Sequence, residues 1–217
     1  MISKGLNLSK DIERIMFDTY SSEDLGLFTG KIGIAIFFYK YGNKLNNQLY
    51  TDFAGELLDE IYEDIDDSIP IDFNVGLTGI GWGIDYLSYN GFVNGNIDEI
   101  LSFIDNEVIF NFHQNKFDYT FLGPIQYILC RINNSRRSSI KQEFEDILKS
   151  VLNDANNNHI VHYINKILNN PETYKREDVL SSIINFEEQN IYGYNESSFI
   201  HLGLNHGLTG YLYSKLI

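Results

Sequence analysis

The chain has 217 residues, of which 43% are hydrophobic and 21% charged, and its formal net charge is −14. This composition is typical of a soluble globular protein with one domain and a substantial core. The acidic balance argues against nucleic acid or an anionic membrane surface as the main partner. No apolar run approaches the ~20 residues that span a bilayer.

The single cysteine, Cys130, excludes an intrachain disulfide and any metal site built from several thiolates of this chain. It lies in the apolar segment YILCRI, which predicts a buried structural thiol. The segment MISKGLNLSKDIERIMF is charged and amphipathic and lacks the features of a secretion signal. We therefore expect a cytoplasmic protein.

Apolar residues recur at helical spacing in four segments that each keep one polar, mostly acidic face. These predicted amphipathic helices cover residues 8–20, 47–65, 95–112 and 138–155. Asn96 stands three residues before Glu99, which predicts a capping pair at the start of the third helix.

Four other segments have glycine at or near their start and are almost wholly apolar afterwards. They cover residues 26–42, 74–87, 121–132 and 203–216. A Thr-Gly pair recurs at Gly30, Gly79 and Gly210, and Leu122-Gly123 is a weaker copy. These segments predict inner helices that are buried on every side.

The spacing of the copies predicts an internal repeat. Gly30 and Gly79 are 49 residues apart, Gly79 and Gly123 are 44 apart, and Gly123 and Gly210 are 87 apart, close to two further steps. A degenerate copy is therefore expected near position 166, within residues 159–170. One amphipathic and one apolar helix per period predict stacked helical hairpins. We expect an all-α fold of about five hairpins, forming part or all of an α/α toroid in a single domain over residues 1–217.

Each glycine inside a helix costs roughly 1 kcal/mol relative to alanine, so the glycine-rich starts need a physical reason. Close approach of neighbouring helices is one interpretation. The other is that the glycines clear room for a ligand near helix N-termini, where N–H groups suit an anion. No Lys-Ser or Lys-Thr follows, as a phosphate loop requires. The glycines concerned are Gly26, Gly30, Gly33, Gly76, Gly79, Gly81, Gly83, Gly123, Gly207 and Gly210.

At these motifs the sequence resembles the lanthionine synthetase C-like family. GLFTGKIGIAIFFYKYG and GLTGIGWGIDYL resemble its Gly-rich inner-helix motifs, GLNHGLTGYLY resembles another copy, and the likeness extends from Gly26 to Tyr213. The resemblance implies an α/α toroid, which in the family typically has seven hairpins. It also implies a link to peptides, because active members use a zinc ion to add a peptide cysteine to a dehydrated serine or threonine.

In active members two cysteines and one histidine hold that zinc, and this pattern carries over only in part. NHGLTG matches the family's Cys-His-Gly motif at His206 and Gly207, with Asn205 at the cysteine position. The only tryptophan, Trp82, is followed by Gly83, where the family's other motif has cysteine. Because a zinc site needs at least three protein ligands, we expect neither the thioether-forming zinc site nor another cofactor.

Three aspartates and one histidine are candidate catalytic residues. Asp72 and Asp85 flank the second glycine-rich segment, and Asp118 precedes the third. If the inner helices start around a common cavity, these carboxylates would converge at its mouth, and paired carboxylates are what glycoside hydrolysis requires. His206 is the fourth candidate. A capping or tyrosine-bonded structural role is the alternative for Asp85.

Two further patterns remain open. His159 and His162 share a helix face but have no identified third ligand, so no metal site is expected from them. RINNSRRSSIK, residues 131–141, is the only basic cluster, and it is either a connecting turn or a grip on a phosphate or an acidic peptide segment.

Three functions fit these observations. The first is a lanthionine synthetase C-like protein without thioether-forming activity that binds a peptide or a peptide-modifying enzyme in bacterial peptide modification. The second is a toroid enzyme acting on a small molecule or carbohydrate through its carboxylates, and the third is a structural or interaction protein. Five hairpins of a seven-hairpin plan would leave open repeat edges, which also suggests a homodimer.

Overall fold

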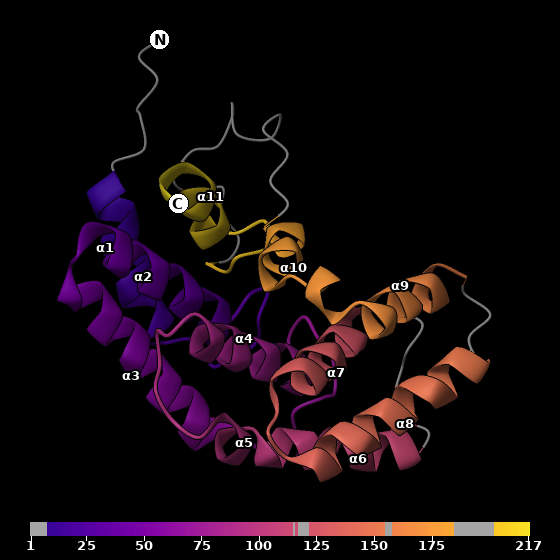
Figure 1. Cartoon of the computed structure of the whole chain (residues 1–217). Coiled ribbons are helices and arrows are strands. Elements are labelled where there is room, and N and C mark those ends of the chain that lie inside the picture. The colour runs from indigo at the N-terminus through magenta and orange to yellow at the C-terminus, as the bar shows by residue number, and fades with distance from the viewer. Residues whose placement is uncertain (1–7, 115, 117–121, 155–157, 185–201) are drawn as a thin grey trace. The chain divides into compact units, whose positions relative to one another are not determined.

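The structure is a computed structural model that describes residues 8–114, 116, 122–154, 158–184 and 202–217. Helices and their connecting turns account for these residues, and none of them lies in a strand, so the predicted all-α class is confirmed (Figure 1). In chain order the helices are α1 (Leu8–Thr19), α2 (Lys31–Leu45), α3 (Gln48–Asp64), α4 (Leu77–Tyr89), α5 (Ile97–Ile100), α6 (Ser102–His113), α7 (Leu122–Asn134), α8 (Ser138–Asp154), α9 (Asn158–Asn169), the 3-10 helix η1 (Pro171–Thr173), α10 (Arg176–Ile183) and α11 (Leu208–Leu216).

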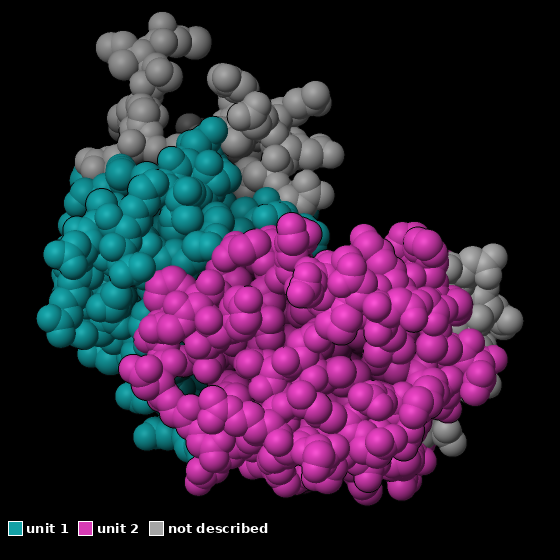
Figure 2. Space-filling model, viewed as in Figure 1, with its two compact units in different colours: residues 1–65, 181–217 teal, residues 66–180 magenta. Residues whose placement is uncertain are grey.

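The chain divides into two compact units, residues 1–65 with 181–217 and residues 66–180 (Figure 2). The single domain over residues 1–217 stays a prediction. Among the described helices, none is both long and apolar enough to cross a membrane.

In the first unit, α2 is the inner helix. Its residues from Lys31 to Gly42 are buried apart from the half-buried Lys40, and it packs along α3 and against α11. The rings of Phe38 and Phe53 meet edge to face, with centroids 4.8 Å apart. Aromatic pairs of this kind add to the apolar burial that holds the two helices together.

In the unit 66–180, α4 is the inner helix, and all its residues from Leu77 to Leu87 are buried. It contacts α6 and α7, and α8 packs against α6, α7 and α9. A Cβ atom on Gly81 would lie 2.5 Å from Cε2 of Tyr127 on α7 and 3.2 Å from the Ile104 side chain on α6. The glycine therefore allows three helices to approach closely, which supports the packing interpretation at this position.

Two local predictions differ from the structure in detail. A helix, α9, does cover the range of the degenerate copy expected near position 166, but it buries only the stripe of Ile160, Ile164 and Ile167 rather than every side. These isoleucines stand at i, i+4 and i+7, so they make one apolar face, and the remaining positions include exposed polar residues. The capping pair expected between Asn96 and Glu99 does not form through side chains. Asn96 is the N-cap residue of α5, but its side chain makes no capping hydrogen bond; its backbone carbonyl accepts from the Glu99 N–H instead.

Candidate functional site

Asp85 is held in a buried ion pair inside the unit 66–180. Its Oδ2 accepts hydrogen bonds from Nε of Arg176 at 2.7 Å and lies 2.6 Å from Nη2 of the same guanidinium. Its Oδ1 accepts from the Asn134 side chain at 2.9 Å. Asp85 is fully buried, and Arg176 also lies 4.2 Å over the ring of Tyr89. The alternative of a structural role for Asp85 thus has a concrete form, with an arginine rather than a tyrosine as partner.

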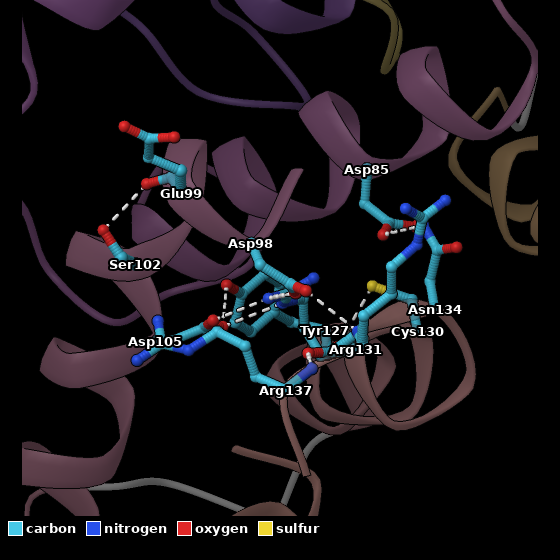
Figure 3. Close-up of polar contacts among 12 residues, drawn as sticks. Asp85, Asp98, Glu99, Ser102, Asp105, Tyr127, Cys130, Arg131, Asn134 and Arg137 are labelled. Atoms are coloured by element: carbon cyan, nitrogen blue, oxygen red, sulfur yellow. Dashed lines mark hydrogen bonds and ion pairs between the residues drawn. The ribbon is translucent and has the colours of Figure 1, made fainter. Parts of the chain in front are cut away.

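A second buried cluster joins α5, α6 and α7 through Arg131, which has no exposed surface (Figure 3). Its Nε and Nη2 donate to the two oxygens of Asp105 at 2.9 and 2.7 Å, and Nη2 also donates to Asp98 Oδ1 at 2.9 Å. The hydroxyl of Tyr127 donates to Asp105 Oδ1 at 2.7 Å. One buried cation therefore compensates two carboxylates, as buried charges require.

Asp98 connects this cluster to the surface. Burial alone raises the pKa of its carboxyl, but hydrogen bonds from the Ser135 hydroxyl, the Arg136 backbone N–H and Arg131 outweigh that effect and leave the pKa below its ordinary value. The Arg136 N–H donates to Asp98 Oδ2 at 2.9 Å. The charged carboxylate thereby fixes the turn between α7 and α8.

An open pocket of about 1000 Å³ lies beside this turn. Its walls come from the end of α4, the segment that enters α5 and α6, and the α7–α8 turn. The lining residues are Ser88, Tyr89, Gly95, Asn96, Ile97, Asp98, Glu99, Ser102, Asn134, Arg136 and Arg137. They are mostly polar or charged, and all of them belong to the unit 66–180.

The structure does not bring Asp72 and Asp85 together. Asp72 is exposed in the turn before α4, where its Oδ1 accepts from the backbone N–H groups of Asn74 and Val75 at 2.7 and 2.9 Å. Asp85 lies eight residues beyond Leu77, the first residue of α4, which is about 12 Å along a helix axis. Asp118 lies outside the described residues. A catalytic role for these carboxylates stays a prediction.

His206 is exposed in the turn that leads into α11, and its φ of 53° places it in the left-handed region. A non-glycine residue there stores local strain. Asn205, at the position that matches the family's cysteine, is already engaged: its backbone N–H donates to Phe28 O and its side chain donates to Ile183 O, both at 2.9 Å. All four residues belong to the first unit.

The environment of Cys130 disfavours metal binding. Cys130 is fully buried, and burial raises the pKa of its thiol well above the ordinary value, so the thiolate needed to bind zinc is disfavoured. Within the described ranges, no three His, Cys, Asp or Glu side chains lie close enough together to hold a metal ion.

Sequence reasoning missed the two buried arginines. Arg131 was counted in the basic cluster of residues 131–141, expected to be either a connecting turn or a grip on an anion, whereas it lies in α7 with its side chain in the core. Its place in the apolar segment YILCRI was the available signal, because a cation inside a buried helix face requires a carboxylate partner. Arg176 gave no such signal, because its partner Asp85 is 91 residues away in the sequence.

Comparison with known proteins gives one match. The model of the family described as "Lanthionine synthetase C-like protein" matches residues 21–217. Neither a search of curated proteins nor a search of solved structures found a match. The family match covers most of the chain, including all the glycine-rich segments and helices α2 to α11. The chain therefore belongs to the lanthionine synthetase C-like family.

Proposed function

We propose that this chain is a peptide- or enzyme-binding component of bacterial peptide modification, acting in the cytoplasm, and that its 217 residues do not themselves perform zinc-dependent thioether formation. The observation that carries the proposal is the pairing of family membership over residues 21–217 with the environment of Cys130. The only thiol of the chain, that of Cys130, lies on the buried face of α7, where it packs as a small apolar side chain.

The residue at the matching motif position supports the same proposal. Asn205 carries no thiolate, and both its backbone N–H and its side-chain amide are used to fasten the turn before α11. Hydrogen bonding through Asn205 therefore holds this turn, and the position offers no thiolate for zinc. A family member of this kind would bind its partner without activating a thiol.

Two measurements test the proposal. Zinc content is measured by mass spectrometry after the purified chain is incubated with zinc and desalted, and substoichiometric zinc is expected. One tightly bound zinc ion per chain would contradict the proposal.

The second measurement is tagged purification from the native host, with mass spectrometry of what co-elutes at stoichiometric level. A peptide rich in Ser, Thr and Cys, or a dehydratase-like enzyme, is expected. A partner-free chain, or one that co-elutes only as its own homodimer through the repeat edges, would count against a role in peptide modification.

A further inference from the structure

Two arginines line the pocket beside the α7–α8 turn. Arg136 and Arg137 are both exposed, and neither guanidinium forms an ion pair with any of the described residues. Their backbone N–H groups, by contrast, are fixed: Arg136 N donates to Asp98 Oδ2 at 2.9 Å and Arg137 N donates to Ser135 Oγ at 3.1 Å. The turn is held through its backbone, so both side chains remain available for a ligand.

The charges around the pocket favour an anionic ligand. Asp98 lines the pocket, but Arg131 and the turn's N–H groups already compensate its charge (Figure 3). Glu99 is the other carboxylate of the lining, which also includes Arg136 and Arg137. Among the exposed charged residues of the lining, the two arginines outnumber the single carboxylate, Glu99, although the chain as a whole has a net charge of −14.

The chemistry of the lining narrows the ligand class. Guanidinium groups present planar pairs of donors that match carboxylates, and the two neighbouring arginines can bind two neighbouring carboxylates. Glu99 opposes a compact dianion such as phosphate, whereas it can accept an N–H from a peptide backbone. Ser88, Asn96 and Ser102 add hydrogen-bonding groups, and the volume of about 1000 Å³ accommodates several residues.

We propose that this pocket binds a peptide segment that carries adjacent acidic residues, with Arg136 and Arg137 pairing with its carboxylates. The inference rests on the proposed peptide-binding function and adds to it the site and the chemistry of the peptide. It is separate from the zinc question, because none of the pocket residues is a cysteine or a histidine.

Fluorescence anisotropy with the full chain tests the proposal. The probe is a labelled Gly-Ser peptide with two adjacent Glu residues, and the matched probe has Gln at the same two places. We expect the Glu probe to bind at low salt at least about tenfold more tightly than the Gln probe, because each lost charged hydrogen bond weakens binding strongly. The double variant R136Q/R137Q should lose this preference.

The control variant K166Q/K175Q removes the same charge from two exposed lysines of the same unit that do not line the pocket. It should retain at least half of the wild-type affinity. Charge reversal provides a second check: R136E/R137E should prefer a probe with two adjacent Lys residues. Thermal unfolding followed by circular dichroism verifies that each variant folds.

Three results would overturn the inference. The first is equal binding of the Glu and Gln probes to the wild-type chain, and the second is equal loss of affinity in R136Q/R137Q and K166Q/K175Q. The third is displacement of the Glu probe by inorganic phosphate but not by chloride at the same ionic strength, which would identify the site as a phosphate site. Each of these leaves the proposed function standing if the native purification still yields a peptide or enzyme partner.

Discussion

Breaking the ion pair between Asp85 and Arg176 should strongly destabilise the unit 66–180. In Asp85→Asn the carboxylate is replaced by a neutral amide of nearly the same shape, and Arg176 loses the charge that compensates it. The guanidinium cannot reach water easily, because its side chain is 6% exposed. We expect the free energy of unfolding to fall by about 3–5 kcal/mol, which is the usual cost of leaving one charge of a buried ion pair without its counter-charge.

The structure supports the upper part of that range. Two nitrogens of Arg176 lie 2.7 and 2.6 Å from Asp85 Oδ2, and Asn134 donates to Oδ1 at 2.9 Å. An asparagine at position 85 retains one acceptor oxygen, so at least one of these donors loses its partner. Its amide group would also point hydrogens at another donor.

Equilibrium urea unfolding followed by the fluorescence of Trp82 measures the effect. Trp82 is the only tryptophan and lies on α4 with Asp85, so its signal reports the unit that contains the pair. The matched control is Asp146→Asn, which removes the same charge from an exposed pair with Lys149 and should leave the urea midpoint unchanged.

A double replacement separates charge from packing. Asp85→Leu with Arg176→Met substitutes apolar side chains for both ions and should recover a large part of the stability that Asp85→Asn loses. If Asp85→Asn stays within about 1 kcal/mol of the wild-type chain, the buried pair is not a stabilising element and the reasoning fails.

Two further predictions concern packing and pH. Gly81→Ala should lower the free energy of unfolding by about 1–3 kcal/mol, since its Cβ would meet the Tyr127 ring. Gly55→Ala, whose Cβ would lie 3.5 Å from its nearest neighbour, should be neutral or stabilising. Equal effects of the two variants in urea unfolding followed by circular dichroism would contradict the packing interpretation. Burial raises the pKa of Cys130 in the folded state, so only the unfolded chain ionises its thiol above about pH 8.5, and stability should fall as pH rises beyond that value. Cys130→Ala should remove that part of the pH dependence, and a slope identical to that of the wild-type chain would refute the assignment.

Local sequence patterns were sufficient to place most helices. The range predicted from periodicity at residues 47–65 differs by one residue at each end from α3 (Gln48–Asp64), and that at 138–155 differs by one residue from α8 (Ser138–Asp154). The glycine-rich segments were also recognised as inner helices, since α2 and α4 are buried on all sides. Helix bounds and buried helices depend on residues close together in the chain, and the hydrophobic periodicity of a single sequence shows these directly.

The candidate site was less predictable, because its contacts join residues far apart in the chain. Asp85 was noticed as a carboxylate on an apolar helix, but the identity of Arg176 as its partner depends on how α10 packs. The approach of Asp98 to the α7–α8 turn likewise joins residues 38 positions apart. No periodic pattern records such pairings, and without them the sequence could not decide whether the basic cluster is a connecting turn or a binding site for an anion.

The distinction between buried and exposed arginines is the strongest argument for a ligand at the pocket. Arg131 and Arg176 are enclosed and ion-paired with aspartates, so replacing either one removes a charge on which folding depends. Arg136 and Arg137 lie within a few residues of Arg131, yet the described structure uses only their backbone groups. Their side chains can therefore be exchanged without loss of core contacts. If R136Q/R137Q abolishes peptide binding while its unfolding midpoint stays at the wild-type value, the two guanidinium groups act on a ligand and not on the fold.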